Sequence, residues 1–209
     1  MTARVENLVT SGTFSLDGGT WDVDNNVWIV GDDAEVIVID PAHDADAVAT
    51  AVGDRSVKAV LLTHGHDDHI RHARSAAEKL GAEIWMNPAD QMLWEAVFPG
   101  TRPDHEIADG DRFEVAGTEL IALHTPGHSP GSTCFHAPAL GTVFSGDTLF
   151  NGGPGATGRS YSDFGTIVES IRTRLLGLPE ETVVRTGHGD TTRIGDEAPN
   201  VQDWIDRGH

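Results

Sequence analysis

Residues 63–69 of this chain read Thr-His-Gly-His-Asp-Asp-His and directly follow an apolar run at residues 57–62. Imidazole and carboxylate groups gathered this densely suit borderline divalent metals such as zinc. In an extended segment residues i and i+2 share a face, so His64 and His66 can point to one metal ion. The apolar spacing then becomes helical, which places Asp68 and His69 at a strand-to-helix junction where they can turn toward a second ion. The segment therefore predicts a metal site at the end of a buried strand.

Three later motifs each place one more candidate ligand in a glycine-containing turn. His128 lies in Thr-Pro-Gly-His-Ser-Pro-Gly-Ser, Asp147 in Ser-Gly-Asp-Thr-Leu-Phe, and His188 between two glycines. Glycine lets the backbone approach closely, so that a side chain can be aimed at a fixed point. Each motif alone is weak, because a lone Gly-His-Gly is more often an ordinary turn. Together with the first cluster they supply five histidines and two aspartates, enough for two ions with one carboxylate between them.

Composition limits the class of protein and its partners. A length of 209 residues suits one substantial core, so we expect a single domain over residues 1–209. A net charge of -19 with no cluster of basic residues argues against nucleic acid and anionic membranes as partners. The N-terminus lacks the apolar region of a signal peptide, and the one cysteine, Cys134, excludes an intramolecular disulfide. We therefore expect a cytoplasmic protein with Cys134 as a small buried apolar residue. The sequence does not indicate an oligomeric state.

Strand and helix patterns alternate in two similar halves. We expect strands at residues 26–30, 35–40, 57–62, 83–86, 112–115, 118–123, 132–136, 142–145 and 182–185. We expect helices at residues 45–52, 68–80, 88–98, 163–176 and 199–207, and loops at residues 21–24 and 99–111. Because the polar clusters stand at strand ends, this order predicts an α/β fold with two packed sheets and helices outside, rather than a doubly wound parallel sheet.

The four motifs together resemble the signature of the metallo-β-lactamase superfamily, His-x-His-x-Asp-His followed by His, Asp and His. The resemblance implies an αββα sandwich of two mixed β-sheets with helices on the outer faces and metals at one edge. It also implies two divalent metal ions, zinc first, with iron or manganese as alternatives. The implied ligands are His64, His66 and His128 for the first ion, Asp68, His69 and His188 for the second, and Asp147 as the bridge.

Details of the motifs narrow the branch of the superfamily. Secreted β-lactamases of the commonest type carry a cysteine where Asp147 stands, flavin-linked diiron proteins a glutamate where His66 stands, and lactonases a tyrosine where Phe150 stands. The sequence motifs around His128 and Asp147 look most like those of glyoxalase II, the hydroxyacylglutathione hydrolase group. In that group a basic residue and a tyrosine bind the thiol carrier, and Arg159 and Tyr161 fit this pair. Because only about twenty residues follow His188, we expect this chain to lack the C-terminal helical domain of full-length glyoxalase II.

The resemblance implies a metal-dependent hydrolase acting on the thioester of a small acyl-thiol conjugate. A hydroxide shared by two metal ions would attack the thioester carbonyl. Asp68, as the catalytic residue, would orient this hydroxide. Two alternatives stay open, a mononuclear iron oxidoreductase resembling persulfide dioxygenases and a hydrolase of lactones or other esters. Asp40 is a candidate to orient a ligand imidazole, and Asp67 is either a second such residue or solvent-exposed. The other histidines are interpreted as structural or surface residues, namely His43, His72, His105, His124, His136 and His209.

Overall fold

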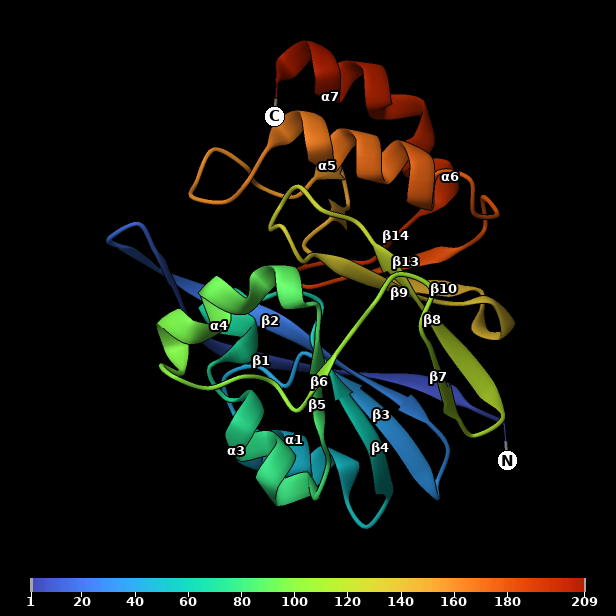
Figure 1. The fold of residues 1–209 in the computed structure, drawn as a ribbon. Coiled ribbons are helices and arrows are strands. Elements are labelled where there is room, and N and C mark those ends of the chain that lie inside the picture. Colours follow the sequence, from blue (N-terminus) through green and yellow to red (C-terminus); the bar gives the residue numbers. More distant parts are fainter. Residues whose placement is uncertain (1, 209) are drawn as a thin grey trace.

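Two six-stranded sheets lie face to face in the computed structural model, which describes residues 2–208 (Figure 1). The strands of the first sheet, in spatial order, are β1 (Arg4–Leu16), β2 (Gly19–Gly31), β3 (Glu35–Ile39), β4 (Ser56–Leu61), β5 (Ile84–Met86) and β6 (His105–Glu106). Those of the second are β14 (Thr192–Arg193), β13 (Val183–Thr186), β10 (Thr142–Gly146), β9 (Thr133–Ala137), β8 (Thr118–His124) and β7 (Arg112–Val115). A small separate pair is formed by β11 (Leu149–Phe150) and β12 (Gly153–Pro154). Both large sheets mix parallel and antiparallel neighbours, as predicted.

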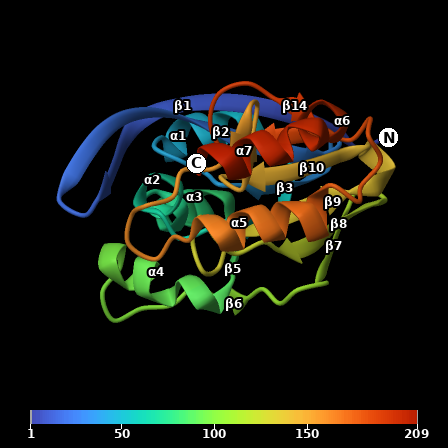
Figure 2. The same cartoon turned by 90° about the horizontal axis from the view of Figure 1, so that it is seen from above.

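Helices cover the outer faces of the two sheets (Figures 1 and 2). The first half contains α1 (Ala45–Val52), α2 (Asp67–Ile70), α3 (Ala73–Leu80) and α4 (Gln91–Val97). The second half contains α5 (Phe164–Ser170), α6 (Ile194–Glu197) and α7 (Val201–Arg207). Short 3₁₀ turns lie at Pro88–Asp90, Pro138–Leu140 and Ala198–Asn200, and a π-helical turn at Ile171–Leu175 continues α5. The predicted αββα sandwich is therefore confirmed.

Apolar layers hold the sandwich together on three levels. Between the sheets, residues such as Leu61, Phe135 and Phe144 are buried in one cluster. Outside the first sheet, α1, α3 and α4 pack against strand residues through two further clusters. Outside the second sheet, Ile167 of α5 and Trp204 of α7 pack against β9, β10 and β13. Burial of each large apolar side chain stabilises the fold by about 1.5–3 kcal/mol. The many buried side chains of these layers therefore hold the strand ends in place.

The N-terminal hairpin is the largest departure from the sequence prediction. β1 and β2 pair antiparallel from Arg4 opposite Gly31 to Leu16 opposite Gly19, so residues 21–24 lie in a strand and the predicted loop was wrong. The sequence of β1 shows little alternation of apolar and polar residues. In the structure Thr10 is its only buried residue, so the strand has no apolar face that could have marked it. The turn between the strands is Asp17-Gly18, and both residues have positive φ (52° and 78°). Asp-Gly is a typical two-residue hairpin turn, and this signal could have revealed the hairpin.

Other differences are local. The helix predicted over residues 68–80 is broken into α2 and α3, because His72 between them has φ -102° and ψ 0°. Strand β6 lies inside the predicted loop 99–111. Among the described residues, no helix combines the length and apolar character needed to cross a membrane. The interpretation of His209 lies outside the described residues.

Candidate metal centre

The predicted ligands come together because the strands that precede them end at one edge of the sandwich. β3 and β4 are parallel neighbours in the first sheet, and β10 and β13 are parallel neighbours in the second. The carboxyl ends of parallel strands meet at one edge of a sheet. His64 therefore follows β4 beside Asp40, which follows β3, and His188 follows β13 beside Asp147, which follows β10. His128 enters from the loop between β8 and β9.

His64, His66 and His128 form a first group of three imidazoles. The Nδ1 atom of His66 lies 3.0 Å from Nε2 of His64 and 2.9 Å from Nε2 of His128. Imidazole nitrogens bound tetrahedrally to zinc at about 2.0 Å lie roughly 3.3 Å apart. All three side chains are buried. The three nitrogens thus converge within 4.8 Å of one another, close enough to face one ion.

Asp68, His69 and His188 form a second group beside the first. The Nε2 atoms of His69 and His188 lie 3.2 Å apart. Oδ2 of Asp68 lies 3.4 Å from the first of these nitrogens and 3.3 Å from the second. One carboxylate oxygen and two imidazole nitrogens therefore surround a second position.

The Asp147 carboxylate lies between the two groups. Its Oδ2 atom lies 3.6 Å from Nε2 of His128 and 3.3 Å from Nε2 of His188, and its Oδ1 atom lies 3.5 Å from Nε2 of His69. Oδ1 is buried and has no hydrogen-bond partner among the described residues. A buried carboxylate oxygen without a partner is costly, so this atom fits a cation better than it fits an apolar interior. Each ligand group also has its donor atoms within 4.8 Å of one another.

Hydrogen bonds behind the imidazoles fix which nitrogen faces the centre. Nδ1 of His69 lies 2.9 Å from Oδ2 of Asp40, Nδ1 of His128 lies 2.8 Å from the Ala156 carbonyl oxygen, and Nδ1 of His188 lies 2.8 Å from the Asp24 carbonyl oxygen. Each of these oxygens can only accept, so each Nδ1 must be the donor.

His64 is held in the same way through a hydroxyl group. Its Nδ1 atom lies 3.1 Å from Oγ1 of Thr63, which donates its own proton to Oδ2 of Asp40 at 2.6 Å. The hydroxyl oxygen therefore accepts from His64. Four imidazoles thus turn Nε2 toward the centre, as metal-ligating histidines do when an outer acceptor holds them. Asp40 thus lies where it can orient the imidazole of His69, a predicted ligand.

Burial and charge act differently on the two groups. Burial lowers the pKa of His64 well below its usual value and that of His66 to about 3, so both are neutral. Burial also lowers the pKa of His69 and His188, but nearby carboxylates outweigh it and raise the pKa values to about 9 and about 11. Burial alone would raise the pKa of Asp68, yet His69 and His188 outweigh it and bring it to about 2. The second position therefore attracts protons or a metal cation, and a metal would displace those protons.

Two residues that sequence analysis missed support the ligands from behind. Asn25 is fully buried, donates from Nδ2 to Oδ2 of Asp68 at 3.0 Å, and has its Oδ1 atom 2.7 Å from Nε2 of His43. His43 thus has a structural role behind the second position. Asp90 is also fully buried and bonds the loops that carry the first group. Neither residue belongs to a ligand motif, and their contacts join parts of the chain far apart in sequence.

Asp67 has neither of the roles expected for it. Its side chain is only 11% exposed, accepts from the backbone N–H of Ser15 at 2.9 Å, and pairs with Arg71. It therefore attaches the tip of the N-terminal hairpin to α2.

The two predicted substrate-binding residues lie in the segment after β12. The guanidinium carbon of Arg159 lies 3.9 Å from the centroid of the Trp21 ring and 5.9 Å from that of Phe14. The Phe14 ring in turn lies 5.2 Å from the imidazole of His66. Arg159 is therefore linked to the first group through two aromatic rings of the hairpin. Tyr161 is 55% exposed, and its role in substrate binding stays a prediction.

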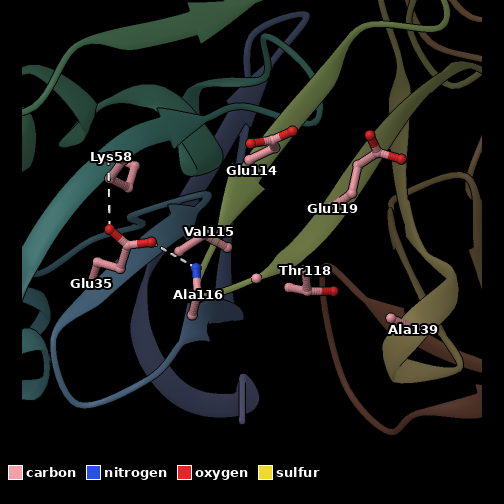
Figure 3. Close-up of a pocket in the computed structure, with 9 residues that line it drawn as sticks. Glu35, Lys58, Glu114, Val115, Ala116, Thr118, Glu119 and Ala139 are labelled. Carbon is pink, nitrogen blue, oxygen red and sulfur yellow. Dashed lines mark hydrogen bonds and ion pairs between the residues drawn. The ribbon is translucent and has the colours of Figure 1, made fainter. Parts of the chain in front are cut away.

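A pocket of about 600 Å³ lies at the other end of the sandwich, near the start of β3 (Figure 3). Glu35 accepts there from the backbone N–H of Ala116 at 2.7 Å and pairs with Lys58 at 3.7 Å. The residues that line the pocket include no histidine or cysteine, and Glu35 is already paired. We therefore place the chemistry at the His/Asp cluster.

Comparison with known proteins agrees with this geometry. The metallo-β-lactamase superfamily profile matches residues 20–188. The chain belongs to the metallo-β-lactamase superfamily. The hydroxyacylglutathione hydrolase GloC of Haemophilus influenzae is 34% identical over 181 residues, which cover 79% of this chain and 85% of that protein.

Two crystal structures also resemble this superfamily member. BLEG-1, a B3 metallo-β-lactamase, has a TM-score of 0.76 at 28% identity. The match covers 91% of this chain and 97% of the BLEG-1 chain. TTHA1623 in a di-iron-bound form has a TM-score of 0.74 at 29% identity and covers 90% and 96%. The His/Asp cluster of this superfamily member is thus suited to divalent metal ions.

Proposed function

We propose that this chain is a glyoxalase II-like thioesterase that hydrolyses the thioester of a small acyl-thiol conjugate. The observation that carries the proposal is the Asp147 carboxylate lying between two groups of converging ligand atoms. Such an arrangement suits two cations that act on one carbonyl group. The likeness to a hydroxyacylglutathione hydrolase supports a thioester as the bond that is cleaved.

The ligand atoms favour zinc, with iron or manganese as alternatives. When bound, two such ions would supply a hydroxide nucleophile near neutral pH and polarise the carbonyl oxygen. Asp68 is the residue we assign to orienting the nucleophile, and the bond from Asn25 keeps its carboxylate in place. In the overall reaction the oxygen of water bonds to the carbonyl carbon, the carbon–sulfur bond breaks, and the electron pair leaves with sulfur. The products are a carboxylic acid and a thiol.

Arg159 gives the substrate a cationic contact beside the centre. Stacking on Trp21 holds the guanidinium in place, and Phe14 fills the space between it and His66. A thiol carrier that ends in a carboxylate fits this layout, with its sulfur at the ligand cluster and its carboxylate at Arg159. Tyr161 is proposed as a second contact to the carrier.

The setting that we propose is the cytoplasm, because Cys134 is a free buried thiol that needs no oxidising compartment. Nucleic acid and membrane surfaces are not among the proposed partners, because a net charge of -19 repels both. The proposed partner is the small acyl-thiol substrate itself.

A hydrolysis screen tests the proposal. The metal-loaded protein is assayed on S-acyl derivatives of glutathione, cysteine and coenzyme A, with a lactone and a β-lactam for comparison. We expect the highest kcat/KM on a thioester and loss of activity in Asp68→Ala. Preference for the lactone or the β-lactam would replace the thioesterase with another hydrolase. One iron per chain together with thiol-dependent oxygen uptake would replace it with an oxidoreductase.

A second variant tests the carrier contact. Arg159→Ala should raise KM for the best thioester at least several-fold while kcat changes less. Arg172→Ala is the matched control. Arg172 lies in the turn that follows α5, is exposed, and pairs with Glu169 of α5. Equal KM values in the two variants would remove Arg159 from the proposal.

A further inference from the structure

We infer that Asp90 is a positioning residue that fixes the distance between the two loops carrying the first ligand group. Asp90 is the last residue of the 3₁₀ turn before α4, and its side chain is fully buried. Burying a carboxylate is costly unless it is well hydrogen-bonded. Its presence in the interior therefore calls for a reason in the groups that it binds.

Those groups belong to both ligand loops. Oδ2 of Asp90 accepts from the backbone N–H of Gly65 at 2.8 Å and from Oγ of Ser129 at 2.6 Å. Oδ1 accepts from the backbone N–H of Gly131 at 2.6 Å. Gly65 stands between His64 and His66, whereas Ser129 and Gly131 are the first and third residues after His128. One carboxylate thus bridges the segments that supply all three imidazoles.

The fit around Asp90 is tight and leaves little freedom for adjustment. A Cβ atom added to Gly65 would lie 3.0 Å from Cβ of Asp90, and one added to Gly131 would lie 2.7 Å from Cγ of Asp90. The two glycines therefore let the loops approach the carboxylate closely. A longer acidic side chain has no space here, and a neutral one cannot accept on both oxygens.

Asp90→Asn separates this role from simple packing, because the amide has nearly the same size as the carboxylate. If the amide oxygen takes the place of Oδ2, the NH₂ group faces the backbone N–H of Gly131, and two donors oppose each other. The loop after His128 must then move away from the loop that contains Gly65. Asp90 bonds only to the loops of the first ligand group, so we expect the change to weaken that group more than the second group, Asp68, His69 and His188.

The experiment uses the metal-loaded protein and measures metal binding. Wild type, Asp90→Asn and the control Asp32→Asn are titrated with a chelator, and their cobalt(II)-substituted forms are compared by visible absorption. Asp32 is a matched control, because it is also buried and accepts backbone N–H groups, from Ala34 and Glu35, at the other end of the first sheet. We expect the affinity of one of two ions to fall about 10-fold to 100-fold in Asp90→Asn, with an altered cobalt spectrum. Asp32→Asn should change neither quantity.

The inference would be overturned if Asp90→Asn had the metal affinities and the cobalt spectrum of wild type. This holds whatever the thermal stability of the variant. An equal loss of affinity in both variants would overturn it too. If Asp90→Asn does not fold, Ser129→Ala replaces it in the experiment. This variant removes the hydroxyl that donates to Asp90 and keeps the Asp90 carboxylate. It should weaken the same ion less strongly, and unchanged affinities would again reject the role. Because the readout is metal binding, a negative thioester screen leaves this inference standing.

Discussion

The Nδ1 atom of His69 lies 2.9 Å from Oδ2 of Asp40, and both side chains are almost completely buried. Asp40 also accepts from the backbone N–H and from Oγ1 of Thr63 at 2.8 and 2.6 Å. These bonds hold Asp40 in a left-handed backbone conformation with φ 48°. One carboxylate thus links the ends of β3 and β4 and aims a ligand at the second position.

Asp40→Asn should weaken metal binding at the second position about 10-fold to 100-fold. Asparagine tolerates the left-handed conformation, but its amide group must turn an N–H toward either Thr63 or His69. Chelator titration and metal content measure the loss. Asp44→Asn is the control, because Asp44 caps α1 and asparagine caps helices equally well. A metal affinity equal to that of wild type would show that the ring of His69 is held by other contacts.

Metal removal should lower the thermal stability, and more strongly at high pH. In the metal-free protein the folded-state pKa of His69 is raised from 6.5 to about 9. The stability that this histidine contributes is therefore complete below pH 6.5 and is lost as the pH rises through about 9. Bound metal instead stabilises the folded protein by about 2.7 kcal/mol at a free concentration of 100 times Kd.

Scanning calorimetry at pH 6 and pH 9, with metal and with chelator, measures this difference. We expect the gap in Tm between the two samples to widen with pH. A gap that narrows, or a Tm indifferent to chelator at both pH values, would mean that no metal is bound at His69.

The residues that meet in the His/Asp cluster could be predicted because each is marked locally. His64, His66, Asp68 and His69 lie in one short motif after an apolar strand, and the later ligands stand in glycine-containing turns at or near strand ends. Parallel strand pairing then brings these ends to one edge, which is a property of the fold and not of any one motif. Sequence periodicity indicated most strands of the two sheets, but not β1 or β6 at the two ends of the first sheet.

The supporting residues could not be predicted, because their roles depend on long-range contacts. Asn25 reaches Asp68 across 43 positions, and Asp90 reaches Gly131 across 41. A lone asparagine or aspartate carries no local pattern that indicates such a partner. Strand β1 was missed for a different reason: its residues are mostly exposed or half-buried, so pairing with β2 and not burial fixes its conformation.

Asp17→Gly should loosen the hairpin tip and raise KM without loss of metal. Asp17 accepts from the backbone N–H and from Oγ of Ser160 at 3.0 and 2.6 Å, which attaches the tip beside Arg159. Glycine suits the positive φ of this position, so the change removes the side chain without backbone strain. Steady-state kinetics on the best thioester, with metal content as the control, measure the effect. An unchanged KM would separate the hairpin tip from substrate binding.

Cys134 should be inert to thiol reagents in the folded protein. Its side chain is fully buried in β9, and burial raises the pKa of the thiol to about 11. At pH 8 only about one thiol in a thousand is then the reactive thiolate, and that thiol lies beneath the packed layer of α5 and α7. A disulfide reagent should label it only after denaturation, and Cys134→Ala should keep the metal content of wild type, because sulfur belongs to neither ligand group. Rapid labelling of the folded protein would instead show that α5 and α7 separate from the second sheet under native conditions, since the reagent has to pass between them.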